Sequence, residues 1–307
     1  MSNRKFIVIT GPTASGKTDV AVKVAKILDS QIISADSMQI YMGMDIGTAK
    51  VTAAEMQGVP HHLLDVVTPA EDYSTASFQK DAFSLINQLN EKGVIPIVCG
   101  GTGLYINALV YKLDFFNHSK DENVRQKYAQ LADDKSIQYL YNILKTKDPK
   151  YASIISSNDK KRIIRRLEII EATGIRHYNF RQYNDNYDII TIGLRMPRDI
   201  LYERINRRVD NMIKTGLVDE VKRVYSQYGR VNALMAIGYN ELISYFEGKC
   251  DLAEAIGLIK RNTRRLAKRQ ITWFNRDERI KWFDISAYSC IEDTINDIII
   301  YIKGKGF

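Results

Sequence analysis

The sequence predicts an α/β fold in which a parallel β-sheet is flanked by helices and interrupted by a helical insertion domain. Short apolar runs alternate with helical patterns over the first third of the chain. A glycine-rich turn joins the first apolar run to the first helical pattern. From about residue 113 to residue 188, charged and tyrosine-rich segments at helical spacing replace the strands, and the next strong apolar run is Ile189–Ile192.

The expected elements alternate in the order that a parallel sheet requires. Strands are predicted at residues 5–10, 31–34, 95–99 and 189–194, and helices at residues 16–28, 77–92 and 104–110. Beyond the last strand, Pro197 and Asp199 suit the start of a helix and Gly216 suits its end. Further helices are expected at residues 218–228 and 251–275. The predicted domains are therefore a core of residues 1–112 and 189–307 and a helical insertion of residues 113–188.

Length and composition restrict the class of protein. A chain of 307 residues exceeds the usual size of one compact core, and its hydrophobic content of 45% is ordinary for a globular protein. The apolar stretch near the N-terminus, Phe6–Ile9, is too short for a signal peptide or a membrane span. Three widely spaced cysteines predict neither disulfides nor a metal cluster. His61 and His62 are adjacent, so in an extended segment their side chains point in opposite directions, which argues against a metal site formed by the pair. We expect a cytoplasmic protein.

The net charge of +8 is concentrated in two segments. The first carries Lys160, Lys161, Arg162, Arg165, Arg166, Arg176 and Arg181. The second carries Lys260, Arg261, Arg264, Arg265, Lys268, Arg269, Arg276, Arg279 and Lys281. Two basic segments far apart in the sequence are typical of a bipartite contact with a nucleic-acid backbone. Either one alone is equally well interpreted as a solvated helix face.

A phosphate-binding loop follows the first predicted strand. Its residues, which match G-x-x-x-x-G-K-[ST], are Gly11, Pro12, Thr13, Ala14, Ser15, Gly16, Lys17 and Thr18. Backbone N–H groups and the start of the next helix would bind phosphate oxygens, Lys17 would reach the outer phosphate, and Thr18 would help to hold Mg²⁺. The fold is thus of the P-loop type. The motif leaves open whether ATP or another diphosphate is bound, and which reaction follows.

Asp36 closes the second predicted strand and should face the phosphate loop, because ligands bind beyond the carboxyl ends of parallel strands. Two functional interpretations remain. The carboxylate can hold Mg²⁺, or it can accept a proton from a nucleophile beside the phosphate chain. A third, structural interpretation is a helix cap or turn, which Asp followed by Ser often forms.

Two further segments are expected to border the same cleft. Thr102 lies in the glycine-rich turn after the strand at residues 95–99, where a tight structural turn is the simpler interpretation. Arg204 and Arg208 share one face of the helix after the last core strand. Arginines at that place can clamp a departing diphosphate, although Glu203 and Asp210 would also suit surface ion pairs.

Together these segments resemble the bacterial tRNA dimethylallyltransferases, also called tRNA isopentenyltransferases. The stretches that carry the resemblance are Gly11–Thr18, Ile33–Tyr41, Asp45–Lys50, Pro60–Val66, Gly100–Ala108, Arg162–Gly174, Arg207–Met212, Ala236–Leu242 and Lys268–Phe274. They run in order through almost the whole chain, so the resemblance is far more specific than the phosphate loop alone. One departure is Asn240, where relatives often carry a basic residue.

The resemblance implies transfer of a dimethylallyl group from dimethylallyl diphosphate to N6 of the adenosine at tRNA position 37, next to the anticodon. It implies that Asp36 acts as the base, and that Lys17, Thr18, Mg²⁺ and Arg208 stabilise the departing diphosphate. The adenosine must leave the anticodon stack to reach the site. A monomer that binds the anticodon stem-loop is expected.

The resemblance also implies which residues contact the tRNA. They are Asp36, Ser37, Met38, Gln39, Thr102, Arg125, Asp159, Lys160, Lys161, Arg162, Ile163, Lys268, Arg269, Thr272 and Trp273. The stretch at residues 159–163 coincides with the first basic segment, which stands out by its charge alone. This coincidence suggests that the insertion embraces the anticodon stem.

Two other classes of protein share part of this pattern. A nucleoside or nucleotide kinase would share the phosphate loop but would need a base-binding pocket for ATP, and no base-recognition motif stands out in the sequence. A prenyltransferase acting on free adenine nucleotide would not need the two basic segments. An RNA-binding nucleotide switch would hydrolyse GTP or ATP without prenyl transfer, and only the phosphate loop on a basic chain supports it.

Overall fold

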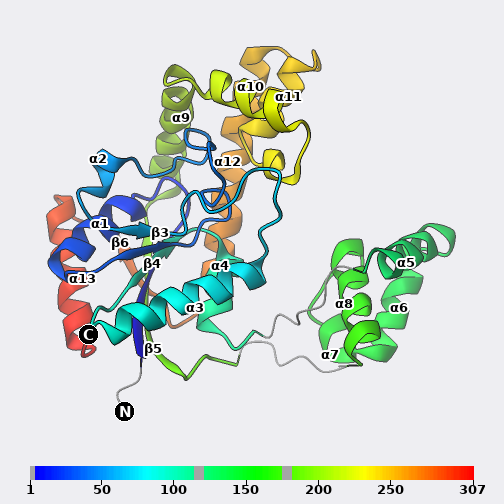
Figure 1. Cartoon of the computed structure of the whole chain (residues 1–307), viewed down its shortest axis with the longest axis horizontal. Helices are drawn as coiled ribbons and strands as arrows, with labels where there is room; N and C mark the ends of the chain where they lie inside the picture. Colours follow the sequence, from blue (N-terminus) through cyan, green and yellow to red (C-terminus); the bar gives the residue numbers. More distant parts are fainter. Residues whose placement is uncertain (1–3, 114–120, 175–181) are drawn as a thin grey trace. The chain divides into compact units, whose positions relative to one another are not determined.

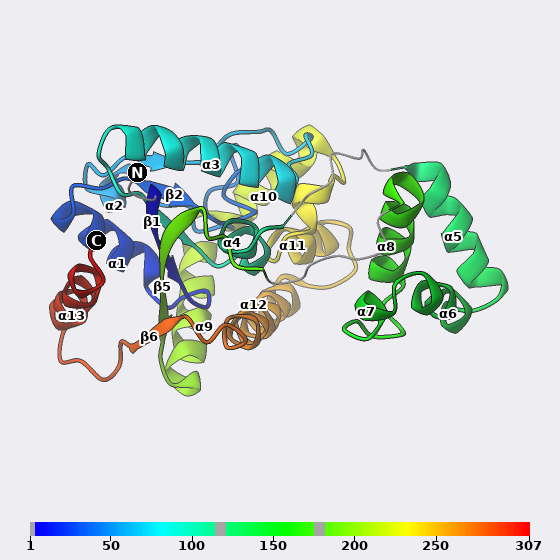
Figure 2. The ribbon, with the colours of Figure 1, turned by 90° about the horizontal axis from the view of Figure 1, so that it is seen from below.

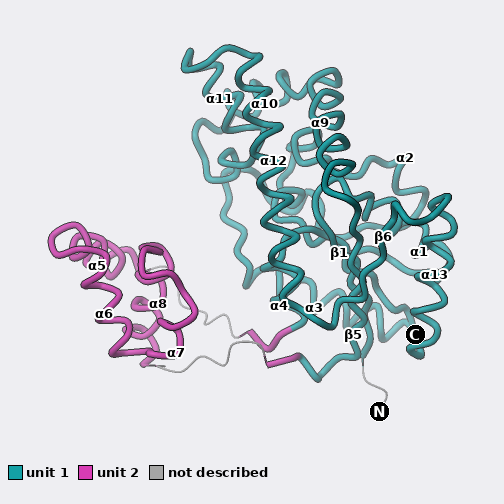
Figure 3. Tube along the Cα trace, turned by 180° about the vertical axis from the view of Figure 1, so that it is seen from behind, with its two compact units in different colours: residues 1–110, 184–307 teal, residues 111–183 magenta. Residues whose placement is uncertain are grey.

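The computed structural model describes residues 4–113, 121–174 and 182–307. The chain forms two compact units, one of residues 1–110 and 184–307 and one of residues 111–183 (Figure 3). The smaller unit begins at residue 111 and ends at residue 183, whereas the sequence predicts an insertion of residues 113–188. The reason is that residues after 183 pack with the sheet: Asn184 donates its backbone N–H to the carbonyl oxygen of Val110 at 2.9 Å.

A six-stranded sheet forms the centre of the larger unit (Figure 1). Its strands are β1 (Arg4–Thr10), β2 (Ile32–Ser34), β3 (His61–His62), β4 (Ile97–Gly100), β5 (Tyr187–Arg195) and β6 (Lys281–Asp284). Their order is β3-β2-β4-β1-β5-β6, and every neighbouring pair is parallel. The central position of β1 places the phosphate loop between the ends of β4 and β5, so the predicted α/β fold class is confirmed.

Helices cover both faces of this sheet (Figure 2). Alternate side chains of β1 point to opposite faces. Ile7 and Ile9 pack in a core with helices α1 (Lys17–Ile27) and α13 (Ile291–Gly304). Phe6 lies on the other face and contacts Tyr187, whose ring stacks on Phe83 of helix α3 (Thr75–Glu91). Both faces of β1 are therefore buried, as its continuous apolar sequence predicts.

A second group of helices packs beside the sheet around its own apolar core. These elements are α9 (Arg198–Lys214), α10 (Leu217–Tyr228), the 3₁₀ helix η1 (Asn232–Met235), α11 (Tyr239–Phe246) and α12 (Leu252–Phe274). Gly216, with φ of 103°, separates α9 from α10, as its sequence position predicts. The core includes Ile40, Tyr41 and Met44 from the segment after β2. This packing ties the polypeptide that follows Asp36 to α10 and α11.

The remaining helices of the larger unit are α2 (Ala53–Met56) and α4 (Gly103–Val110). The strands β3 and β6 are not predicted from the sequence because both are short and partly polar, and neither α11 nor α13 is predicted. His61 and His62 form β3, and their ring nitrogens bond to Val59 and Gln31 rather than to each other.

The smaller unit is helical in its described part. It contains α5 (Glu122–Asp134), α6 (Ile137–Lys147), α7 (Pro149–Ala152) and α8 (Lys160–Thr173). Tyr128, Leu144 and Leu167 belong to its separate core. An ion pair between Asp148 and Arg166 is also buried there, and Asp148 caps α7 as well. In the described residues of the whole chain, no helix is both long and apolar enough to cross a membrane.

Candidate active site

The phosphate loop occupies the sharp turn between β1 and α1. Gly11 lies so close to β5 that a Cβ atom there would be 2.7 Å from the carbonyl oxygen of Leu194, so a side chain is excluded. Gly16 caps α1 with φ of 82°, a conformation that glycine adopts without strain. The Ser15 hydroxyl is buried, and no described residue hydrogen-bonds to it. These features suit a loop whose polar groups bind an anion.

Two cations and one carboxylate converge at this loop. Burial lowers the pKa of the Lys17 ammonium, while the charge of Asp36 opposes that change. Burial likewise lowers the pKa of the Arg208 guanidinium, and Asp36 is again an opposing charge. Among the described residues Asp36 forms an ion pair with neither. The arrangement leaves positive charge directed at the loop, where an anionic ligand would stabilise it.

Arg204, one helical turn before Arg208, also reaches the loop. A Cβ atom at Gly16 would lie 3.4 Å from its Nη2 atom. Arg207 points elsewhere and pairs with Glu203 at 2.6 Å. Arg204 and Arg208 are therefore placed as their spacing on one helix face predicts. The surface ion pair with Glu203 is formed by Arg207 instead.

The turn after β2 holds Asp36 against the turn after β4. The Asp36 Oδ1 atom accepts the backbone N–H of Met38 at 2.9 Å, and no described residue donates to Oδ2. Thr102 Oγ1 accepts the backbone N–H of Ser37 at 3.0 Å. At Gly100 a Cβ atom would lie 2.1 Å from the carbonyl oxygen of Ala35, so only glycine permits this approach. Thr102 thus forms a structural contact beside Asp36.

The Gln39 side chain is directed into the protein. Its amide nitrogen donates to the carbonyl oxygens of Thr48 and Ala49 at 3.4 and 3.2 Å. Its amide oxygen accepts from the Ser34 hydroxyl at 3.1 Å. The predicted RNA contact at Gln39 would have to compete with these bonds, whereas Ser37 and Met38 are half-buried beside Asp36.

Helix α12 joins the phosphate loop to the turn after β4 through Gln270, a residue with no role predicted from the sequence. Gln270 accepts the backbone N–H of Thr13 at 2.8 Å and donates to the carbonyl oxygen of Gly101 at 2.9 Å. One turn further on, Trp273 lies over Gly103, where a Cβ atom would be 2.4 Å from the indole. Gln270 and Trp273 are three residues apart and share one helix face, but nothing local in the sequence indicates which loops that face contacts.

Other predicted contacts on α12 lie on its solvent side. Lys268, Arg269 and Thr272 are exposed, and the Thr272 hydroxyl donates to the Lys268 carbonyl within the helix. The described residues offer Lys268 and Arg269 no ion-pair partner. These two charges are therefore available to an anionic partner.

In the helical unit, several predicted RNA contacts already have protein partners. Arg125 donates to the buried carboxylate of Glu168 at 3.0 Å, and Lys160 pairs with Asp133. Asp159 caps α8 by accepting the backbone N–H of Arg162 at 3.1 Å. Lys161 is exposed, and no described residue pairs with it. Arg176 and Arg181 of the first basic segment lie outside the described residues.

Ile163 differs from its neighbours. None of its surface is exposed, because its side chain packs in the core of the helical unit. The expectation of a tRNA contact at Ile163 therefore finds no accessible side chain in this structure. Its hydrophobic spacing with Leu167 and Ile170 on α8 is the sequence signal for a core position.

The fold and this site define a class of protein: a P-loop-type α/β protein with a cationic phosphate loop facing a carboxylate, joined to a separate helical unit. The comparisons with known proteins narrow that class. A family model described as IPP transferase matches residues 39–277. The chain therefore belongs to the IPP transferase family, as its resemblance to the tRNA dimethylallyltransferases predicts.

The bacterial relatives match over nearly their whole length. The tRNA dimethylallyltransferase of Carboxydothermus hydrogenoformans is 51% identical over 302 residues, 97% of each chain. That of Caldanaerobacter subterraneus is 47% identical over 311 residues, 98% of each chain. The crystal structure of the tRNA isopentenylpyrophosphate transferase of Bacillus halodurans is 44% identical, with a TM-score of 0.75 over 98% of this chain and 96% of its own. A eukaryotic dimethylallyltransferase acting on tRNA is 29% identical, with a TM-score of 0.80 over 92% of this chain and 74% of its own.

Proposed function

We propose that this chain transfers a dimethylallyl group from dimethylallyl diphosphate to N6 of adenosine 37, next to the anticodon of tRNA. The products are N6-(dimethylallyl)adenosine and diphosphate. The observation that carries the proposal is the convergence of Lys17 and Arg208 on the phosphate loop with Asp36 beside them. The membership of the IPP transferase family supports the same reaction.

The cations would act on the leaving group. As the bond between C1 of the dimethylallyl group and the diphosphate oxygen breaks, the electron pair stays with the diphosphate. Lys17, Arg208 and the backbone N–H groups of the loop would stabilise that charge more strongly as it develops. The partial burial of Lys17 and Arg208 strengthens each interaction, because water screens these charges less than on an open surface.

Asp36 would act on the nucleophile. The exocyclic amine of adenine is a weak nucleophile, since its lone pair is delocalised into the ring. The N6 nitrogen forms the new bond to C1, and its proton passes to the Asp36 carboxylate. Oδ2 is the suitable acceptor atom, because Oδ1 already accepts the N–H of Met38.

Mg²⁺ is part of the proposal. No group of three or more His, Cys, Asp or Glu side chains gathers in the described parts of the chain. A magnesium ion held by one hydroxyl together with ligand phosphates and water fits these residues, and the exposed Thr18 would supply the hydroxyl. When bound, the ion would neutralise charge on the diphosphate.

The tRNA would be bound by exposed basic side chains of both units. Lys268 and Arg269 on α12 and Lys161 and Arg162 on α8 are the exposed cations among the predicted contacts, and of these Arg162 pairs with Asp159. The chain's three cysteines are free, and tRNA is the substrate, which supports the cytoplasm as the compartment. We propose that the enzyme acts as a monomer, since all proposed catalytic groups come from one chain.

A labelling experiment tests the reaction. The protein is incubated with dimethylallyl diphosphate carrying a label in its dimethylallyl group and with either unmodified tRNA or AMP. Label in the tRNA supports the proposal. Label in AMP but not in tRNA would identify a free-nucleotide prenyltransferase, and RNA-stimulated release of phosphate from GTP or ATP without label transfer would identify a nucleotide switch.

A further inference from the structure

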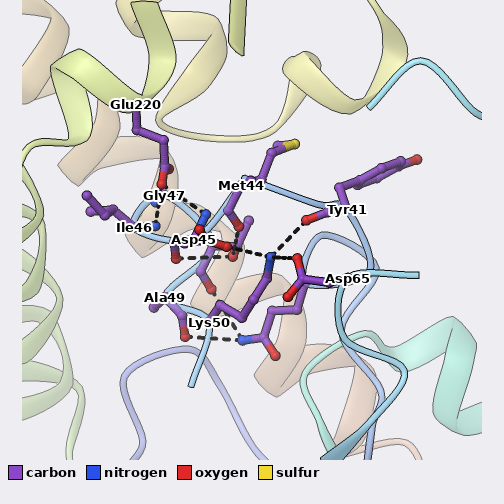
Figure 4. A network of polar contacts seen from close by, with 12 residues as sticks. Tyr41, Met44, Asp45, Ile46, Gly47, Ala49, Lys50, Asp65 and Glu220 are labelled. Atoms are coloured by element: carbon purple, nitrogen blue, oxygen red, sulfur yellow. Dashed lines mark hydrogen bonds and ion pairs between the residues drawn. The ribbon is translucent and has the colours of Figure 1, made fainter. Parts of the chain in front are cut away.

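We propose that Glu220 is a positioning residue, which holds the segment of residues 45–50 in place and through it the turn that carries Asp36. This inference rests on the proposed function. Glu220 lies on α10 and is only 6% exposed. It lies 184 positions away in sequence from the carboxylate that it would position, and Figure 4 shows its contacts with the segment of residues 45–50.

The Glu220 carboxylate accepts four hydrogen bonds from neutral donors. Oε2 accepts the backbone N–H groups of Asp45 and Ile46 at 3.0 and 2.8 Å. Oε1 accepts the backbone N–H of Gly47 at 2.9 Å and the Tyr239 hydroxyl at 2.6 Å. Three consecutive N–H groups converging on one anion form the kind of site that usually binds a phosphate or a capping carboxylate.

Glu220 has no cationic partner among the described residues. A buried carboxylate without a cation is costly unless hydrogen bonds replace its hydration, and here all four come from the segment and from Tyr239. Burial, followed by the charge of Glu220, raises the pKa of the Tyr239 phenol, so this hydroxyl stays a donor. Displacing the segment would leave the charge unsatisfied, which makes the bound arrangement stiff.

Glycine at position 47 is required for this arrangement. A Cβ atom there would lie 2.4 Å from the Tyr239 ring. The segment closes on itself through the backbone N–H of Lys50, which donates to the Asp45 carbonyl oxygen at 2.9 Å. Residues 45–50 are therefore a compact turn that contacts the Glu220 carboxylate and the Tyr239 ring.

The turn of residues 45–50 also holds the polypeptide after Asp36, through contacts on two sides. Gln39 donates to the carbonyl oxygens of Thr48 and Ala49, and it also bonds to Ser34 at the end of β2. Lys50 donates to the carbonyl oxygen of Tyr41 at 2.8 Å and pairs with Asp45 and Asp65 (Figure 4). Asp36 lies between Ser34 and Gln39, so a shift of the turn would move the base carboxylate.

Helix α10 is also a neighbour of the diphosphate clamp. It begins at Leu217, three residues after α9 ends at Lys214, and α9 carries Arg208. One pair of consecutive helices thus fixes the cation that would hold the leaving group and the anchor for the turn beside the base. Catalysis depends on the relative positions of such groups, since a displacement of about 1 Å can lower the rate about a hundredfold.

The test compares Glu220→Gln with wild type. The amide cannot accept bonds on both of its terminal atoms, so the turn should loosen. We expect kcat for transfer to tRNA to fall about 10- to 100-fold, while KM for dimethylallyl diphosphate and the Kd of inorganic diphosphate change less than about 2-fold. Amide hydrogen exchange should quicken in residues 36–41 as well as 44–50. Assays are run well below the melting temperature of each variant.

Two controls separate positioning from general stability. Tyr239→Phe removes one of the four donors but keeps the ring, so kcat should fall less than in Glu220→Gln. Glu247→Gln removes a carboxylate at the end of α11 that pairs with Arg230 and accepts the Tyr225 hydroxyl of α10. Since Glu247 makes no hydrogen bond or ion pair to the described residues 36–50, this change should leave kcat unchanged. If Glu220→Gln does not fold, Tyr239→Phe decides the matter by the same readouts.

Wild-type kcat in folded Glu220→Gln, or unchanged exchange at residues 36–41, would overturn the positioning role. An inactive wild-type protein would instead refute the proposed function. The exchange measurement needs no activity, so the mechanical coupling from Glu220 to the Asp36 turn is tested in either case.

Discussion

The side-chain amide of Gln270 bridges the two loops of the candidate site, accepting the backbone N–H of Thr13 at 2.8 Å while it donates to the carbonyl oxygen of Gly101. Gln270 lies on α12 between Arg269 and Trp273, two of the predicted tRNA contacts. The helix that carries the predicted RNA contacts is thus hydrogen-bonded to the loop that would hold the diphosphate. Under the proposed function, this contact would give the two substrates a shared structural support.

Replacing Gln270 with alanine should weaken use of dimethylallyl diphosphate. The change leaves a half-buried N–H and a carbonyl oxygen without partners, at a cost of about 1–3 kcal/mol. We expect kcat/KM for dimethylallyl diphosphate to fall about tenfold or more, measured by steady-state label transfer. Thr263→Ala, which removes a hydrogen bond within the same helix, is the control. Equal losses in both variants would mean that Gln270 only stabilises α12.

Lys161 should carry more of the salt dependence of tRNA binding than Lys160. Lys160 is paired with Asp133, whereas Lys161 is exposed. Removing one phosphate-binding cation should lower the slope of log K against log salt by about 0.7–0.9. Lys161→Ala should show this reduction in filter-binding titrations, and Lys127→Ala, whose ammonium pairs with Glu171, should not. An unaltered slope for Lys161→Ala would show that α8 presents only a solvated face.

Acid should destabilise the helical unit through Glu168. Burial opposes ionisation of this carboxyl, but hydrogen bonds from Arg165, the Asp121 backbone and Arg125 outweigh it and lower its pKa. A depressed folded-state pKa contributes stability above the unfolded value of about 4.5, and that stability is lost as pH falls through the folded value. Glu168→Gln should therefore unfold with a flatter pH dependence below about pH 4.5, measured by circular dichroism. A wild-type slope in this variant would remove Glu168 from the acid transition.

Cys99 should resist alkylation although it lies beside the phosphate loop. Burial raises the pKa of its thiol to about 11, and only the thiolate reacts. Mass spectrometry after brief treatment with iodoacetamide at about pH 8 should find label on the exposed Cys290 before Cys99. The rate at Cys99 should rise about tenfold per pH unit up to about pH 10. Rapid, pH-independent labelling of Cys99 would contradict the buried, neutral thiol.

Most of the sheet could be predicted because its strands are apolar and bounded by turn residues. The run Phe6–Ile9 followed by a glycine-rich loop specifies a buried strand and a phosphate site with little ambiguity. The two-residue strand at His61 carries no such pattern, since its pairing with β2 depends on the rest of the sheet. β6 is likewise short, and only its register with β5 makes Lys281–Asp284 a strand.

The site was predictable where a residue type matches its chemistry, as at Lys17 and Asp36. It was not predictable where a residue acts through geometry. Gln270 and Glu220 contact loops more than 160 positions away in the sequence, and no local pattern reports such contacts. Ile163 shows the opposite failure: the family resemblance implied an RNA contact there, whereas its helical spacing places it in the core.

The most direct test of the central claim is nucleoside analysis of the product. Wild-type protein and the Asp36→Ala variant are incubated with dimethylallyl diphosphate, Mg²⁺ and unmodified tRNA carrying adenosine 37, and with the same tRNA carrying guanosine there. The account predicts N6-(dimethylallyl)adenosine only from the tRNA that carries adenosine 37, and turnover about 10²–10⁴-fold lower in the variant with nearly unchanged tRNA affinity. Prenylated nucleoside from the guanosine tRNA, or normal turnover in Asp36→Ala, would contradict it.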